Sequence, residues 1–140
     1  MTDVRITINT EEVIRQLDAT PQQVRIAMRQ AVDDATALIL RDQKTYPPAP
    51  PNSTYRRTRT LGRSWTREIT ENGDTIRGRV GSNANVAPYN RYVQDEAMQA
   101  RIHAGRWNNT IQGTVRNRQA TVQRMFEDRL RAAVEDGRWL

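Results

Sequence analysis

Hydrophobic and polar residues alternate at the start of the chain and then change period. Apolar side chains occupy every second position from Val4 to Ile8, which predicts a half-buried strand over about residues 3–9. Thr10 is then expected to cap a short helix that ends near Asp18, with two glutamates in its first turn to complement the helix dipole.

A second helix start follows at Thr20, Pro21 and Gln23. Threonine at the cap, proline at the first helical position and glutamine three residues after the cap form a capping-box pattern. Apolar residues then recur at spacings of three and four, which predicts an amphipathic helix of about 24 residues ending near Lys44. Its predicted apolar face consists of Val24, Ala27, Met28, Ala31, Ala35, Leu38 and Ile39.

The middle of the chain predicts a β-hairpin. Residues 64–69 and 75–80 have strand character, and the connection between them contains Asn72-Gly73, a strong hairpin signal. Pro88 is expected to open a short helix that runs to about Val93. One predicted face of the hairpin carries Trp65, Arg67 and Ile69 on the first strand and Ile76, Gly78 and Val80 on the second.

The last third predicts a further strand over residues 98–103 and a C-terminal helix over 110–135, capped at Gly137. The sum is an α+β fold with a small antiparallel sheet packed against two main helices. The expected apolar side of the C-terminal helix consists of Val115, Val122, Met125, Phe126, Leu130, Ala133 and Val134.

A proline-rich, basic connection interrupts this pattern at about residues 45–60. Four of the five residues from Pro47 to Pro51 are prolines, and they favour an extended, polyproline-like backbone. Long connections of this kind are often functional or become ordered on a partner, although the composition is equally compatible with a spacer.

Composition narrows the class of protein. A chain of 140 residues fits one domain, residues 1–140, and its hydrophobic fraction of 36% indicates a thin core that a partner or a second subunit would help to stabilise. The chain has no cysteine, which excludes disulfides, cysteine-bound zinc and a thiol nucleophile. We expect an intracellular protein without a membrane segment, because neither a secretory signal nor a long apolar run is visible.

Positive charge is concentrated in the second part of the chain. Of 22 basic residues only Lys44 is a lysine, and the net charge is +6. Two stretches contain no acidic residue, one from Arg56 to Arg67 and the other from Ala97 to Phe126. Such stretches are compatible with contacts to phosphate groups and equally with contacts to an acidic protein surface.

The sequence contains few residues or motifs that indicate an enzyme. His103 is the one histidine, so a histidine-rich metal site cannot form within a single chain. The sequence also lacks a phosphate-binding loop, a dinucleotide fingerprint and a nucleophile elbow. We therefore expect no enzyme, metal or cofactor. The one enzymatic alternative is a small basic ribonuclease-like toxin that would use His103 as its acid or base.

Residues 55–109 resemble phage neck and tail-completion proteins, the family that contains the minor tail protein Z of lambda-like siphophages. The similar segments are Thr-Arg-Thr-Leu-Gly-Arg-Ser-Trp at 58–65, Val-Gly-Ser at 80–82 and Val-Ala-Pro-Tyr-Asn-Arg-Tyr-Val-Gln at 86–94. The predicted order of elements is also similar. The chain departs from the family at Arg59 or Thr60, where glycine is usual, and at Gln94-Asp95-Glu96, where the family often has Glu-x-Gly-Thr.

The resemblance implies a structural virion protein that assembles in the host cytoplasm and resides in the phage neck. It would form a homo-oligomeric ring, commonly a hexamer, that completes the tail and contacts other neck proteins and the tail tube protein, while genomic DNA passes through. A head-closure or connector component is the near alternative, and a basic nucleic-acid-binding protein is the alternative from another class. Most arginines would then pair with acids of neighbouring subunits. The expected contact residues are Arg56, Arg57, Arg59, Arg63, Trp65, Arg67, Tyr89, Arg91, Tyr92, Arg101, His103, Arg106 and Trp107.

Overall fold

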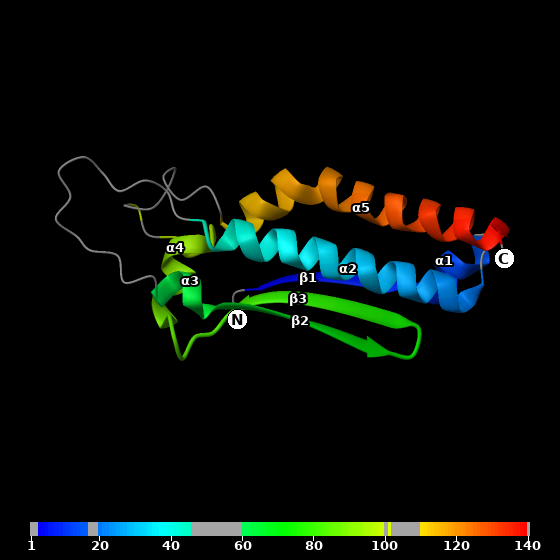
Figure 1. The fold of residues 1–140 in the computed structure, drawn as a ribbon. Coiled ribbons are helices and arrows are strands. Elements are labelled where there is room, and N and C mark those ends of the chain that lie inside the picture. The colour runs from blue at the N-terminus through cyan, green and yellow to red at the C-terminus, as the bar shows by residue number, and fades with distance from the viewer. Residues whose placement is uncertain (1–2, 17–19, 46–59, 100, 102–109, 140) are drawn as a thin grey trace.

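The computed structural model covers residues 1–140 and describes all of them except 1–2, 17–19, 46–59, 100, 102–109 and 140. The side chains of residues 16, 60–61, 91–92 and 135–139 also lie outside the description. Within these limits the α+β prediction is confirmed (Figure 1). The elements are β1 (Asp3–Asn9), α1 (Thr10–Gln16), α2 (Pro21–Gln43), α3 (Thr60–Ser64), β2 (Trp65–Asn72), β3 (Thr75–Ser82), the 3-10 helix η1 (Pro88–Asn90), α4 (Arg91–Gln94) and α5 (Ile111–Trp139).

The three strands form one antiparallel sheet in the order β1-β3-β2. The predicted hairpin is confirmed, and both of its strands extend two or three residues beyond their expected ends. Asn72 still pairs with Thr75, so the loop consists of Gly73 and Asp74. Gly73 has a φ of 60°, a left-handed conformation that glycine adopts without strain.

The capping box of α2 is present as predicted. The Gln23 N–H donates to the Thr20 hydroxyl oxygen at 3.2 Å, and the Thr20 N–H donates to the Gln23 side-chain oxygen at 3.1 Å. The helix ends at Gln43, with Lys44 as its C-cap. Local sequence therefore determines where this helix begins.

The cap of α1 differs from its prediction. Asn9 caps this helix, because its side-chain oxygen accepts from the backbone N–H groups of Glu11 at 3.0 Å and Glu12 at 3.4 Å. The hydroxyl of Thr10 instead donates to the Asp74 carbonyl oxygen at 2.9 Å. Thr10 is buried by the hairpin turn, which leaves the exposed side chain of Asn9 to cap the helix.

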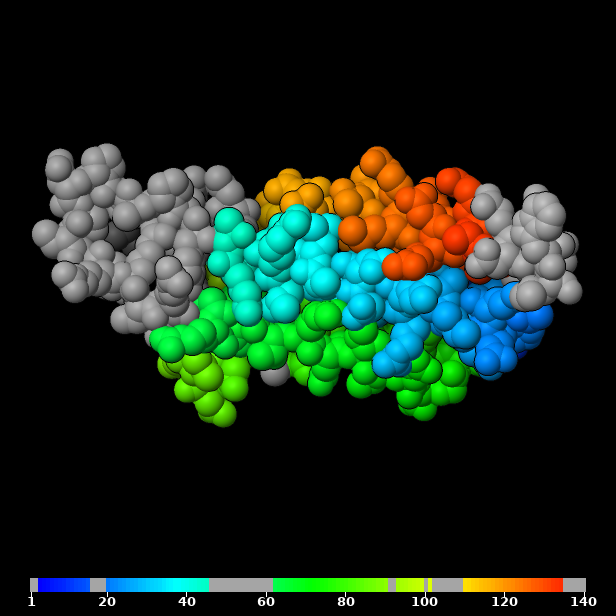
Figure 2. All heavy atoms as spheres, viewed as in Figure 1, coloured from blue at the N-terminus to red at the C-terminus, as the bar shows by residue number. Residues whose placement is uncertain are grey.

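Both long helices lie on one face of the sheet. In Figure 1 they run along the same long axis, and α2 lies between α5 and the hairpin; Figure 2 shows the same order in the packed atoms. A larger apolar cluster joins α2 to Ile76 and Ala133, and a smaller one joins Val4, Ile39 and Trp65. The helix α2 is thus the centre of the core, packed against the sheet on one side and α5 on the other.

The helix α2 packs tightly against the sheet at Gly78. A Cβ atom at this position would lie 2.5 Å from Val32 Cγ1 and 2.6 Å from Thr36 Cγ2. Both of these partners are completely buried. The absence of a side chain at residue 78 therefore sets the distance between helix and sheet.

Three expectations for the last third of the chain are wrong. Met98, Gln99 and Arg101 are not in a strand, since the Met98 N–H donates to the Asp95 carbonyl oxygen and closes a turn; residues 102–103 lie outside the described part. The helix α5 continues through Gly137 to Trp139 instead of ending there. Val115 is 46% exposed, while its neighbours Gly113 and Thr114 are buried.

Candidate interaction surfaces

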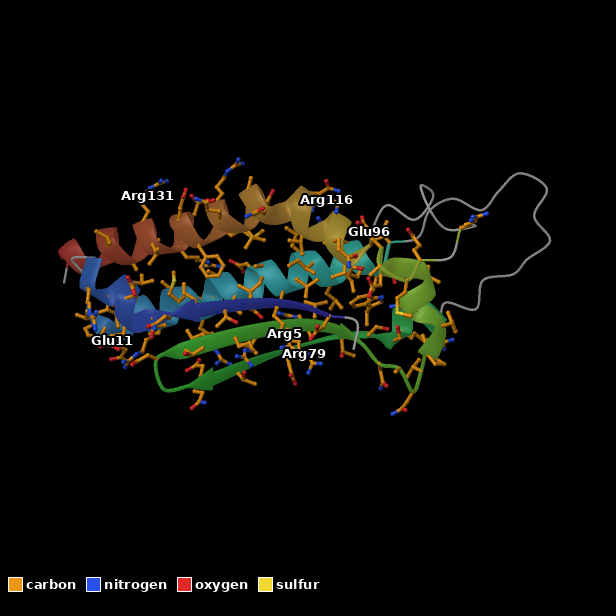
Figure 3. The ribbon with its side chains drawn as sticks, turned by 180° about the vertical axis from the view of Figure 1, so that it is seen from behind. Arg5, Glu11, Arg79, Glu96, Arg116 and Arg131 are labelled. Carbon is orange, nitrogen blue, oxygen red and sulfur yellow. The ribbon has the colours of Figure 1, made fainter. Side chains whose placement is uncertain are left out.

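None of the described elements covers the outer face of the sheet, and none of the side chains on this face is apolar. The pairing register places side chains there in four rows across β1, β3 and β2, none of which contains an apolar residue. Figure 3 shows this face, with Arg5 and Arg79 labelled. The rows are Asn9–Thr75–Asn72, Thr7–Arg77–Thr70, Arg5–Arg79–Glu68 and Asp3–Gly81–Thr66.

A hollow of about 210 Å³ opens beside β2 and β3. Its lining contains one carboxylate, Glu68, which lies 3.7 Å from the Arg79 guanidinium. The other lining residues are Thr66, Arg67, Gly81, Ser82 and Asn83. The Ser82 hydroxyl in this lining is hydrogen bonded to the Ser64 hydroxyl at 2.9 Å.

Both edge strands present unpaired backbone groups. The Thr10 N–H donates to the Asp74 carbonyl oxygen at 2.7 Å, and consecutive residues of a strand point their N–H and C=O groups in opposite directions. Arg5 and Thr7 of β1 therefore direct these groups away from β3. On β2, the bond from the Asn83 N–H to the Ser64 carbonyl oxygen shows which residues face β3. By the same alternation, Arg67 and Ile69 direct their backbone N–H and C=O groups away from β3. Within the described chain, no further strand pairs with either edge.

Salt bridges within the chain neutralise much of the arginine charge. Ten of the fifteen arginines whose side chains are described pair with a carboxylate of the same chain. Several of these pairs hold α2 in place. They are Arg25–Asp74, Arg29–Glu71 and Arg67–Asp33 on the sheet side, and Arg118–Asp42 and Arg129–Asp34 on the α5 side.

These pairs reduce the number of arginines that are available to acids of neighbouring subunits, while the expected contacts between subunits stay a prediction. Arg67, Arg116 and Arg118 belong to stretches of sequence without acidic residues. In the fold, each pairs with a carboxylate from outside its stretch. Figure 3 shows Glu96 and Arg116 together near the start of α5. Arg77, on the outer face, is exposed and has no ionic partner among the described residues.

Two carboxylates have lowered pKa values. Burial by itself would raise the pKa of Asp3, but hydrogen bonds from Arg5 at 3.0 Å and Arg79 at 2.7 Å outweigh burial and hold the pKa below its ordinary value. Hydrogen bonds from Arg116 and then Thr110 lower the pKa of Glu96. Asp3 thereby links β1 to β3, and Glu96 links the segment after α4 to α5.

Replacing Asp3 with asparagine is expected to lower the free energy of unfolding by about 0.5–1 kcal/mol at pH 7, the range of a partly exposed ion pair. Because folding lowers the pKa of Asp3, its contribution is present above the unfolded value near 3.8 and is lost as the pH falls through the folded value. Urea unfolding at pH 7 and at pH 3 should show a difference between wild type and D3N that shrinks in acid. Glu127→Gln, on an exposed residue of α5 where glutamine keeps an oxygen that can accept from Gln123, serves as the control and should show little difference at either pH. An equal D3N deficit at both pH values would contradict the assignment.

The residues predicted to contact other subunits differ in how exposed they are in the structure. Arg63 and Arg101 are exposed, and Tyr89, the middle residue of η1, is 45% exposed. Arg67 is exposed but bonded to Asp33. The backbone of α4 contains Arg91 and Tyr92, whose side chains lie outside the described part, as do all of Arg56, Arg57, Arg59, His103, Arg106 and Trp107.

Trp65 is not a surface residue, which corrects its prediction as a contact. Its side chain is 1% exposed, and the indole Nε1–H donates to Gln94 Oε1 at 2.9 Å. The first residue of β2 points inward under α2, so the ring belongs to the core of its own chain. Sequence reasoning also missed Gln94, because a buried amide has no signature in hydrophobic periodicity.

In comparisons with known proteins, no family model matches the chain, and no curated protein or solved structure matches it either. The described residues contain no group of three or more histidine, cysteine or acidic side chains that could hold a metal ion. None of the described helices has the length and hydropathy that crossing a membrane requires. The surfaces above, and the resemblance of residues 55–109, therefore carry the functional argument.

Proposed function

We propose that this protein is a structural component of the neck of a tailed bacteriophage. It assembles into a ring that completes the tail and joins it to the head-side connector, and DNA passes through the ring without any chemical step. The observation that carries the proposal is the order of the elements: strand, long helix, hairpin, short helix and closing helix. This order is the one that the resemblance implies, and the similar segments lie at its junctions, before β2, at the end of β3 and across η1 and α4.

The open edges of the sheet support assembly between copies. Arg5 and Thr7 on β1, and Arg67 and Ile69 on β2, direct backbone donors and acceptors outward. An edge strand of one copy can pair with the opposite edge of the next, and repeating this contact around an axis closes a ring. The polar outer face is unsuited to a large apolar interface, which leaves the edges as the stronger contacts.

The internal salt bridges weigh against a nucleic-acid-binding protein. Tight binding to DNA needs several basic side chains free to neutralise phosphates. In the described part of the chain most arginines already have a carboxylate partner, as in Arg118 with Asp42. A neck ring requires only that DNA slides past, and a surface whose charges are paired permits this.

The oligomeric state of the purified protein tests the proposal. Light scattering coupled to gel filtration, and electron microscopy of the same sample, should reveal rings or stacked rings of about six subunits. A protein that stays monomeric at all concentrations and binds DNA tightly in a salt-sensitive manner would overturn the proposal in favour of a nucleic-acid-binding function.

Thr7→Pro is expected to weaken ring formation without unfolding the subunit. Residue 7 directs its N–H to the open edge, and its side chain is exposed, so proline removes an intermolecular donor and no internal one. Thr7→Val, which keeps the N–H, is the matched control and should assemble like wild type. Rings of normal stability from T7P, with an unchanged circular dichroism spectrum, would show that the β1 edge is not an intersubunit contact.

A further inference from the structure

One end of the molecule has a polar interior. Nine polar side chains are buried in the described chain, and seven of them gather where α2 ends, β2 begins and α5 starts (Figure 1). Only Thr10 and Thr36 lie elsewhere. The seven are Gln43, Ser64, Ser82, Asn90, Gln94, Thr110 and Thr114.

Gln94 connects three elements at this end. Its Oε1 accepts from the Trp65 indole at 2.9 Å, and its Nε2 donates to the Gln43 carbonyl oxygen at 3.1 Å and to Gln43 Oε1 at 3.3 Å. Gln43 Nε2 donates in turn to the Thr114 hydroxyl oxygen. A chain of side-chain amides thus links α4 to β2, α2 and α5.

Few of the described side chains attach this end of the molecule by apolar packing. In residues 87–94, which we call the clasp, the buried apolar side chains are Ala87 and Val93 among those that the structure describes, which exclude the side chains of residues 91–92. Neither belongs to the two hydrophobic clusters that surround α2. Hydrogen bonds, which contribute modest net free energy, therefore hold the clasp to the body.

Asn90, in the middle of the clasp, weakens the closed state. Its side chain is 1% exposed, and neither Oδ1 nor Nδ2 has a hydrogen-bond partner. In water both atoms would be hydrogen bonded, so closing the clasp loses these bonds without replacing them. An unsatisfied buried amide in a folded protein calls for an explanation.

We propose that the clasp opens locally, before the rest of the fold, and that the open form accepts a polypeptide segment of a neighbouring copy. Opening exposes the Trp65 indole and the amides of Gln43, Asn90 and Gln94. Side-chain amides both donate and accept, as a peptide backbone does, so a neighbouring chain can replace the internal bonds and also satisfy Asn90. The first half of this inference stands on the monomer alone, and the second rests on the proposed function.

Hydrogen exchange of the Trp65 indole N–H, followed by nuclear magnetic resonance, tests the opening. We compare protection factors, the intrinsic exchange rate of each proton divided by its observed rate. In the monomer we expect the protection factor of the indole proton to be at least tenfold lower than those of the backbone amides of Met28 and Val32, which lie in the centre of α2. Equal protection factors would show that the clasp opens only with global unfolding, and the proposal would be wrong.

Two variants at residue 90 test the role of the unsatisfied amide. Asn90→Ala removes it, and Asn90→Leu removes it while refilling the space; at least one should slow exchange of the indole proton by about tenfold, because the closed state no longer buries an unpaired amide. Gln94→Leu should speed exchange, and Asn85→Ala, on an exposed asparagine of the preceding turn, should leave it unchanged. Faster exchange in both Asn90 variants would overturn the assignment.

Assembly of the protein tests the second part of the proposal, in which the open clasp accepts a segment of a neighbouring copy. On assembly of the wild type, exchange of the Trp65 indole proton should slow at least tenfold, and the Asn90 variant with the slower exchange should need a higher protein concentration to assemble. An oligomer that leaves the indole exchange unchanged would exclude the clasp as the contact. If no oligomer forms, the proposed ring fails, while the exchange measured on the monomer still decides whether the clasp opens.

Discussion

Replacing Trp65 with alanine is expected to lower the free energy of unfolding by about 3–5 kcal/mol, the largest effect of any single truncation among the residues that the structure describes. The indole is 1% exposed and packs with Val4, Ile39 and Val80 under the end of α2. Truncation leaves a cavity among these side chains and also removes the hydrogen-bond donor to Gln94. Urea unfolding monitored by circular dichroism would measure the change.

Trp65→Phe separates the two contributions. Phenylalanine keeps most of the apolar volume and lacks the N–H, so the variant should lose about 1–3 kcal/mol, the cost of an unpaired buried oxygen and a small cavity. A negligible change on Trp65→Ala would instead place the indole at an interface between copies. That result would contradict the packing described for β2.

Gly78→Ala is expected to destabilise the fold by about 1–3 kcal/mol or more, although alanine adds only one carbon atom. The new Cβ would lie 2.5 Å from Val32 Cγ1 and 2.6 Å from Thr36 Cγ2, well inside contact distance. Since α2 also packs against α5, the helix cannot move away from β3 without disturbing its second interface. Thermal and urea unfolding would both report the loss.

A double-mutant cycle with Val32→Ala tests this explanation. If the collision is the cause, Gly78→Ala should cost at least about 1 kcal/mol less in the V32A background than in the wild type. Gly73→Ala provides the comparison, because its Cβ would have no neighbour within 4 Å and any cost comes from its φ of 60°. Strict additivity of the first two changes would show that space at Val32 does not limit residue 78.

The parts of the fold that depend on near neighbours were predictable. The capping box of α2 needs only Thr20 and Gln23, and the hairpin needs Gly73 where the chain reverses. The cap of α1 is not decided by near neighbours, because Asn9 and Thr10 are both good capping residues. The hairpin turn buries Thr10, and that contact joins residues 64 positions apart.

Residues that act across the fold were not predictable in the same way. Hydrophobic periodicity assumes that buried positions are apolar, whereas the start of α5 buries Gly113 and Thr114 and exposes Val115. The partners of Gln94 come from elements 29 and 51 positions earlier. Likewise, a stretch without acids says nothing about Asp42, which approaches Arg118 only in the folded chain.

The position of β1 in the sheet also affects how the chain is made. Synthesis produces β1 first, but its partner β3 follows about seventy residues later, and the register joins Asp3 to Gly81. The hairpin can form first from neighbouring residues, which leaves one side of the central strand β3 unoccupied until β1 of the same chain docks on it. During that interval, β1 of another nascent copy can take the vacant place. Exchange of this strand between chains is therefore the misfolding route that the topology makes available, and it becomes more frequent as more copies are synthesised close together.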